Sequence, residues 1–270
     1  MILGIGSYTY GWSVGVPGHA PARTMDEMDL LDRARLHGVR LVQVCDNLPL
    51  LRLSPERLGR FADRASEEGV RVEVGSRGLT PEHALEMIGL ARRLKADLIR
   101  FVVDGPDFHP TPAEVVRILR VVAPRLGELR LGLENHDRLK AAVLRTIVEE
   151  AGSERIGICL DTANSLGAGE GFDAVLAELG PFTFNLHIKD FQVTRLSHQM
   201  GFTVEGRPAG AGMLDIPGLL AGLRRHGGCG SAVLELWTPP GTSPAETVAR
   251  EEEWAAKSLA YLKPLFDGPV

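Results

Sequence analysis

The feature that most constrains the fold is a regular alternation of strand-like and helix-like segments along the whole chain. Eight short apolar runs rich in Val, Ile and Leu recur at intervals of roughly 30 residues, the length of one βαβ unit. They lie at Ile2–Ser7, Val39–Cys45, Val70–Val74, Leu98–Val103, Leu129–Glu134, Ile156–Asp161, Thr183–Lys189 and Ser231–Trp237. Strands that alternate with helices in this way indicate a parallel sheet, because each parallel pair needs a long crossover connection.

Helix start signals separate several of these runs. A hydroxyl residue stands shortly before a glutamate at Thr24, Ser54, Thr80, Thr111 and Ser243, and proline follows directly in the last four cases. Such a hydroxyl can cap free backbone amides, and proline suits the first helical position, where no amide hydrogen is needed. Glycines such as Gly38, Gly152 and Gly227 predict the helix ends.

Eight strand–helix units in 270 residues predict a closed (β/α)8 TIM barrel, an α/β fold that forms a single domain over residues 1–270. No Gly-x-Gly-x-x-Gly follows a strand to suggest an open dinucleotide-binding sheet. The longest stretch expected to be irregular runs from Phe191 to Asp215, and a long loop in a compact fold is more often functional than accidental.

Composition limits the partners and the cellular compartment that can be expected for this chain. A formal net charge of -5 argues against a general nucleic-acid binder, which usually has a basic face. No apolar run approaches the roughly 20 residues that span a membrane, and the first residues form a strand pattern rather than a signal peptide. The three cysteines show no metal-finger spacing and suggest buried thiols in a reducing compartment. We therefore expect a cytoplasmic protein without nucleic-acid or membrane partners.

The last four strand-like runs each present one metal-binding side chain near their carboxyl end. In chain order these are Glu134, Asp161, His187 and Glu235. Side chains alternate along a strand, so these polar positions share a face with small or polar neighbours, while the larger aliphatic residues pack under the helices. Active sites of TIM barrels lie at this end of the strands. The pattern predicts one site assembled from four strands.

Three carboxylates and one imidazole suit Mn²⁺, which we expect to be the metal, or Mg²⁺ or Co²⁺, and Zn²⁺ also accepts these ligands. Any one of these residues alone would be interpreted as a helix cap, an ion-pair member or a core histidine. Four together favour a metal, because uncompensated carboxylates would repel one another. Arg100 and Glu73, predicted to point inward from adjacent strands, are expected to form a separate internal ion pair.

These residues resemble the xylose isomerase-like barrel superfamily, which includes sugar 3-epimerases, inosose dehydratases and apurinic-site endonucleases. The resemblance rests on the four strand-end residues and on three segments, which are Leu160-Asp-Thr-Ala-Asn164, His187-Ile-Lys-Asp190 and Arg207-Pro-x-Gly-x-Gly-x-x-Asp215. It implies that Glu134, Asp161, His187 and Glu235 bind the metal. It further implies that Glu134 and Glu235 are catalytic and exchange protons on opposite faces of the substrate.

The departures from the superfamily narrow the function. Asn164 and the absence of histidine at the ends of the second and third strands disfavour the three-metal nucleases. Three other segments look closer to a branch that includes 3-oxo-isoapionate decarboxylases: Glu134-Asn-His-Asp137, Gly201-Phe-Thr-Val-Glu-Gly-Arg207 and Glu235-Leu-Trp-Thr. The resemblance also implies a homodimer or homotetramer.

Further residues are candidates for substrate binding. His136 follows Glu134 on the same face and could bind a hydroxyl or move a proton, or simply cap a helix. Lys189 would place a cation near the metal, although it could instead pair with Asp190. Arg207 in the long loop could close over an anionic group. Asn164, Trp12 and Trp237 complete the predicted substrate-binding set, the tryptophans as pocket walls.

Three functions follow as hypotheses. The first is a metal-dependent isomerase or epimerase that passes through an enediolate of a small sugar or keto-sugar. The second is a lyase of the same kind, which decarboxylates a 3-oxo sugar acid or dehydrates its substrate. The third is a non-catalytic sugar-binding barrel.

Overall fold

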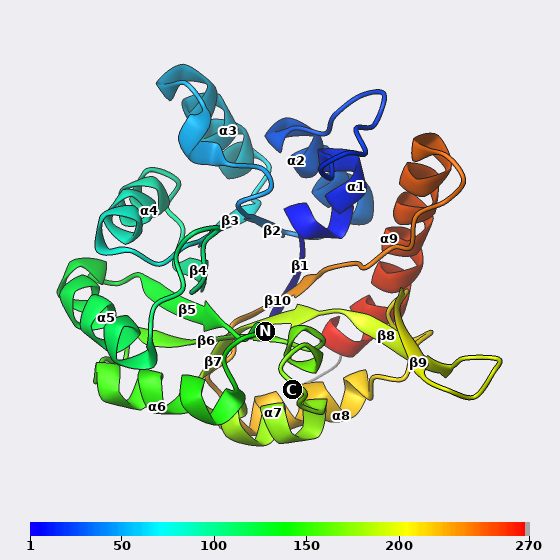
Figure 1. Cartoon of the computed structure of the whole chain (residues 1–270). Coiled ribbons are helices and arrows are strands. Elements are labelled where there is room, and N and C mark those ends of the chain that lie inside the picture. The colour runs from blue at the N-terminus through cyan, green and yellow to red at the C-terminus, as the bar shows by residue number, and fades with distance from the viewer. Residues whose placement is uncertain (268–270) are drawn as a thin grey trace.

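Eight parallel strands close into a barrel at the centre of the molecule (Figure 1). The computed structural model describes residues 1–267. The barrel strands are β1 (Ile2–Gly6), β2 (Leu41–Val44), β3 (Arg71–Arg77), β4 (Leu98–Val102), β5 (Arg130–Glu134), β6 (Ile156–Asp161), β7 (Thr183–Ile188) and β10 (Ser231–Leu234). Each strand pairs with the next along the chain, except that β7 pairs with β10 and β10 closes the ring against β1.

Helices surround the barrel on its outside (Figure 1). They are α1 (Gly11–Val14), α2 (Glu27–His37), α3 (Pro55–Glu67), α4 (Pro81–Arg93), α5 (Pro112–Leu126), α6 (Ala141–Ala151), α7 (Phe172–Leu179), α8 (Ile216–His226) and α9 (Pro244–Asp267). Among residues 1–267, no helix is both long and apolar enough to cross a bilayer. The architecture confirms the predicted (β/α)8 TIM barrel.

Most helix starts follow the predicted capping chemistry. The side chains of Ser54, Thr80 and Thr111 accept hydrogen bonds from backbone amides in the first turns of α3, α4 and α5. The prediction at Thr24 is wrong, because Asp26 caps α2 by accepting from two amides of the first turn. A carboxylate so placed also stabilises the positive end of the helix dipole.

The stretch from Phe191 to Asp215 was expected to be irregular, but much of it forms a hairpin. Strands β8 (Asp190–Arg195) and β9 (Phe202–Arg207) pair in antiparallel register and project beyond the ring of helices (Figure 1). Gly206 at its base packs so closely on Trp237 that an added Cβ would lie 2.1 Å from the Trp237 carbonyl oxygen. The hairpin therefore supports the strand end that carries Glu235 and Trp237.

Asp190 fixes the turn that follows the hairpin. Its carboxylate accepts hydrogen bonds from the amides of Gly210 and Gly212 at 2.9 Å and of Leu214 at 3.1 Å. An added Cβ at Gly212 would lie 2.1 Å from the same carboxylate. The glycine-rich segment is thus explained by close approach to a buried carboxylate, and Asp190 is not the ion-pair partner considered for Lys189.

Close packing inside the wall of the barrel also requires glycine at position 157 of β6. A Cβ there would lie 2.5 Å from the ring of Phe184 and 2.6 Å from the carbonyl oxygen of Phe182. Even if the Phe184 ring turns aside, the Phe182 carbonyl is backbone directly before β7, so it cannot move without disturbing the ladder that carries His187.

We expect Gly157→Ala to lower the free energy of unfolding by roughly 1–3 kcal/mol, the usual range for overpacking. Gly89→Ala is the matched control, because position 89 is exposed within α4 and has open space around an added Cβ. The control should stabilise the protein by about 0.5–1 kcal/mol through helix propensity. Urea unfolding followed by circular dichroism measures both, and equal effects of the two substitutions would contradict this packing argument.

Candidate active site

A cavity of about 210 Å³ opens at the carboxyl ends of the barrel strands. This volume lies below the roughly 300–1,000 Å³ of pockets for drug-sized ligands, so the cavity suits a small molecule. Its wall contains two of the predicted ligands, Glu134 and Glu235, and four of the predicted substrate-binding residues, His136, Asn164, Lys189 and Trp237. The remaining wall is formed by Tyr8, Asp46, Arg77, Arg100, Val102 and Leu236.

The four predicted metal ligands converge on one point beside this cavity. The Nδ1 atom of His187 lies 3.2 Å from Glu235 Oε1, 3.5 Å from Glu134 Oε2 and 3.8 Å from Asp161 Oδ2. None of the four residues is more than 2% exposed. Ligand atoms around one ion at about 2.1 Å lie about 3 Å apart when adjacent, so these separations are close to those of a coordination shell.

Unpaired polar atoms support the fit to a cation. His187 Nδ1 and Glu235 Oε1 are buried without a hydrogen-bond partner. Buried polar atoms are normally paired, and a bound ion is one explanation of exceptions. The residues therefore fit a divalent metal. Two three-residue groups that share His187 could hold one, namely Asp161, His187 and Glu235, and Glu134 and His187 with Cys159.

Two buried cations contact the carboxylates from opposite sides. Lys189 Nζ lies 2.6 Å from Asp161 Oδ2 and 2.8 Å from Glu235 Oε2. The guanidinium of Arg100 contacts Glu134 through Nε and Asp46 through Nη1, the latter at 3.1 Å. Leaving aside the exposed Arg77 at the rim, the group contains four carboxylates (Asp46, Glu134, Asp161 and Glu235) and two cations (Lys189 and Arg100). The excess of two negative charges is one that a divalent ion would neutralise.

These contacts keep the charged groups ionised. Burial alone would raise the pKa of Glu235, but the neighbouring His187 when it is protonated, Lys189 and Arg100 outweigh burial and lower that pKa below its usual value. Burial would likewise lower the pKa of Lys189, whereas the adjacent Asp161 and Glu235 raise it above its usual value.

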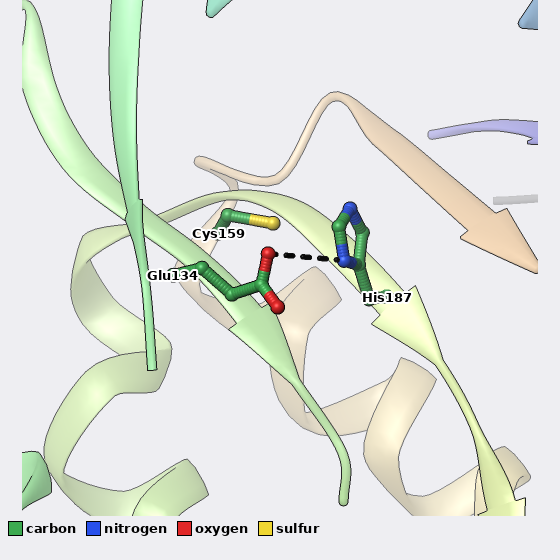
Figure 2. A group of neighbouring side chains, drawn as sticks. All are labelled: Glu134, Cys159 and His187. Carbon is green, nitrogen blue, oxygen red and sulfur yellow. Dashed lines mark ion pairs between the residues drawn. The ribbon is translucent and has the colours of Figure 1, made fainter. Parts of the chain in front are cut away.

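Cys159 also points toward this space, beside Glu134 and His187 (Figure 2). Burial raises the pKa of its thiol well above the usual value, so the group keeps its proton. Its sulfur lies 3.0 Å from Asn185 Oδ1, to which the thiol donates. A protonated thiol is a poor metal ligand, which leaves the carboxylates and His187 as the better donor set.

Asn164 and His136 both lie on the cavity wall. The Nδ2 atom of Asn164 donates to Glu134 Oε1 at 2.7 Å, and its Oδ1 accepts from Lys189 Nζ at 3.3 Å. His136 Nδ1 lies 2.6 Å from Asp137 Oδ1. Asn164 therefore orients a predicted ligand as well as facing the cavity.

The two tryptophans share one cavity, and Trp237 lines a second one as well. Trp237 lines the cavity described above, with its ring 5.7 Å from Lys189 Nζ. Trp12 lines a neighbouring cavity of about 480 Å³ that shares Tyr8 and Trp237, and its indole nitrogen donates to the carbonyl oxygen of Thr238. Both positions are compatible with a wall around a substrate that extends between the two cavities.

Arg207 lies apart from this group. It is not among the residues that line the cavity, and its guanidinium donates to Glu205 and to the carbonyl oxygen of Gly206 at the base of the hairpin. The expected pair of Arg100 with Glu73 is also absent from the described residues. Glu73 instead accepts hydrogen bonds from Gln43 and Asn185.

Sequence reasoning missed the partners of Arg100. Arg100 pairs in register with Gly75 on one side and Gly132 on the other, so its side chain has room to run along the inside of the barrel. It thereby reaches Glu134 and Asp46, which accepts a hydrogen bond from Tyr8. A signal for these partners was present in the sequence. Arg100 is a charged residue within an apolar strand, and glycines on the two neighbouring strands leave its side chain room only along the inside of the barrel.

Comparisons with known proteins agree with this fold. A family model described as xylose isomerase-like TIM barrel matches residues 31–265. The chain is 31% identical over 267 residues to 3-oxo-isoapionate decarboxylase of Pectobacterium atrosepticum, covering 97% of this chain and 95% of the relative.

Solved structures show the same fold at low identity. The D-psicose 3-epimerase of Clostridium cellulolyticum H10 with D-tagatose superposes with a TM-score of 0.75 and 13% identity, covering 99% of this chain and 100% of the other. A xylose isomerase-like TIM barrel protein of Mycobacterium smegmatis in complex with magnesium gives a TM-score of 0.70 and 14% identity, with 97% of each chain covered.

We expect Mn²⁺ to stabilise metal-stripped protein. A ligand at 100 times its dissociation constant adds about 2.7 kcal/mol, which for a chain of this size raises the melting temperature by roughly 5–10 °C. His187→Ala should abolish the shift because it removes the ligand shared by both three-residue groups. His83→Ala is the control, since His83 contacts Ser76 away from this point. Thermal scans with and without Mn²⁺ measure the effect, and an unchanged shift in His187→Ala would contradict the assignment.

Proposed function

This chain belongs to the xylose isomerase-like TIM barrel family, and we propose that it is a divalent-metal-dependent enzyme that decarboxylates a small 3-oxo sugar acid. Glu134, Asp161, His187 and Glu235 would hold the ion, with Mn²⁺ as the expected metal and Mg²⁺, Co²⁺ or Zn²⁺ as alternatives. Two lines support a lyase. One is the relative that is itself a decarboxylase, and the other is the charge arrangement around the two glutamates.

The observation that carries the proposal is that both candidate catalytic glutamates contact a buried cation. Glu134 contacts Arg100 through one oxygen and accepts from Asn164 through the other. Glu235 lies 2.8 Å from Lys189. Carboxylates held in this way are poorly suited to take a proton from carbon, which an epimerase requires of at least one of them. Loss of CO₂ requires no base.

The cations also match the substrate class. A 3-oxo acid carries a carboxylate, and Lys189 and Arg100 offer positive charge in a small, largely buried cavity. Trp237 beside Lys189 would cover the substrate and restrict water. Electrostatic interactions are strengthened when water is excluded.

In the proposed reaction the bond between the α-carbon and the carboxylate carbon breaks. CO₂ leaves, the electron pair passes into an enolate with the 3-oxo group, and one proton is then added to the carbon. A divalent ion bound by the four ligands would polarise the 3-oxo group and stabilise the negative charge that develops there. Lys189 would orient the carboxylate before cleavage, and His136 on the cavity wall is our candidate to return the proton.

A metal-dependent sugar epimerase is the second candidate, because Glu134 and Glu235 both line the cavity and could face opposite sides of a bound ketose. Arg207 does not line the cavity, so it has no evident part in decarboxylation or in epimerisation unless the hairpin moves. A non-catalytic sugar-binding barrel is the third possibility and would bind metal without turnover.

We expect the Mn²⁺-loaded protein to release CO₂ from 3-oxo-isoapionate, the compound named for the decarboxylase relative, and to leave D-tagatose and D-fructose unchanged. Carbon dioxide release and product analysis by NMR measure the two activities. Epimerisation of a ketose without CO₂ release would favour the second candidate, and metal binding without any turnover would favour the third.

Lys189→Met gives a sharper test, because methionine keeps the length of the side chain and removes its charge. Turnover should fall roughly 10²–10³-fold, as when one preorganised charged contact is lost. Mn²⁺ affinity should stay equal or become tighter, since Asp161 and Glu235 lose a competing cation. Lys140→Met, at an exposed lysine, is the matched control. Normal turnover by metal-loaded Lys189→Met would show that Lys189 only neutralises the ligands.

A further inference from the structure

A layer of buried amide and carboxyl groups lies directly beneath the candidate metal ligands. We call Gln43, Glu73 and Asn185 the polar floor. Gln43 and Asn185 have no exposed surface and Glu73 is 1% exposed. They come from β2, β3 and β7, so their contacts run across the inside of the barrel. The proposed reaction does not use any of them.

The hydrogen bonds of the polar floor fix which way each amide faces. Gln43 Nε2 donates to Glu73 Oε2 at 3.0 Å and to Asn185 Oδ1 at 3.1 Å. Asn185 Nδ2 donates to the same Glu73 oxygen at 3.3 Å and to Ser231 Oγ at 2.7 Å. One oxygen of Glu73 accepts from both amides, so the amide nitrogens face it in this arrangement. The carbonyl oxygens are therefore turned away.

Two buried thiols agree with this orientation. Cys45 and Cys159 both have pKa values raised by burial, so each keeps its hydrogen. Their sulfurs lie 3.5 Å from Gln43 Oε1 and 3.0 Å from Asn185 Oδ1. Each thiol thus finds an acceptor where the network places a carbonyl oxygen.

The carbonyl oxygen of Gln43 lies 2.7 Å from His187 Nε2. That oxygen can only accept, so Nε2 must carry the hydrogen. In a neutral ring the lone pair then belongs to Nδ1, which is buried, unpaired and closest to the three carboxylates. Which ring nitrogen faces a metal is commonly set by the hydrogen bond of the other nitrogen.

Without such a contact, the surroundings of Nδ1 would favour the opposite tautomer. Glu235 Oε1 is 3.2 Å from Nδ1 and Glu134 Oε2 is 3.5 Å away, and both are natural acceptors for an N–H group. A hydrogen on Nδ1 would block the ion. The contact with Gln43 opposes this, because moving the hydrogen to Nδ1 would leave two acceptors facing each other at Nε2.

We propose that Gln43, held by Glu73 and Asn185, is a positioning residue that keeps Nδ1 of His187 available as the metal-binding nitrogen. The inference rests on the proposed metal site. It predicts that the chain binds its divalent ion through Nδ1 and that metal affinity depends on an acceptor at position 43, not on the amide as such.

Two variants of Gln43 and one control test whether metal affinity depends on an acceptor at position 43 or on the amide group itself. Gln43→Met removes the acceptor with little change in size, and Mn²⁺ affinity should fall 10–100-fold, the usual effect of losing such a partner. Gln43→Glu keeps an acceptor for Nε2–H and should bind Mn²⁺ as tightly as the wild type or more tightly. Glu251→Gln is the control, because Glu251 is equally buried but contacts Trp12 and Ser13 instead of the polar floor. Its affinity should be unchanged.

Isothermal titration calorimetry with Mn²⁺ gives the affinities, and melting temperatures identify any variant that has lost its fold. Nitrogen-15 NMR of the Zn²⁺-loaded wild type gives an answer that needs no variant, since His187 should show a hydrogen on Nε2 and none on Nδ1. Equal affinity of Gln43→Met and wild type, or a hydrogen on Nδ1, would overturn the inference and leave the proposed function intact. Failure of the wild type to bind Mn²⁺ would overturn both.

Discussion

The main physical constraint on the site is the mutual repulsion of three carboxylates buried at one end of the barrel, which other charges must offset. Glu134, Asp161 and Glu235 converge within a few ångströms of one imidazole nitrogen, where water cannot screen them. Lys189 and Arg100 offset part of this charge from two sides. The residual negative charge, the unpaired Nδ1 of His187 and the unpaired Oε1 of Glu235 would be jointly accounted for by one divalent cation.

The same charges favour decarboxylation over epimerisation, although both reactions occur on this fold. Solved relatives at low identity establish the barrel alone, and the family includes chemistry of more than one kind. In this chain each candidate proton-transferring glutamate contacts a buried cation. Decarboxylation makes use of that arrangement, because it needs a held carboxylate and a stabilised enolate. Two-base proton exchange is hindered by it.

Much of this could be predicted from the sequence where local patterns determine the outcome. Strand alternation brought Glu134, Asp161, His187 and Glu235 to one inward-facing site, and hydroxyl–proline pairs marked the starts of α3, α4 and α5. Contacts across the barrel were harder to predict, because they depend on register and side-chain reach. Arg100 was assigned to Glu73 as the nearest inward carboxylate, whereas its long side chain passes two glycines to reach Glu134. The hairpin of β8 and β9 was missed because its exposed strands carry no apolar run, and Gln43 was overlooked as one polar residue within an apolar strand.

The most direct test of the central claim is the anomalous diffraction of a crystal grown with Mn²⁺. The account predicts one strong peak about 2.2 Å from His187 Nδ1 and from one oxygen each of Glu134, Asp161 and Glu235. A peak bound through Nε2, a peak elsewhere on the chain, or no peak at saturating Mn²⁺ would contradict it.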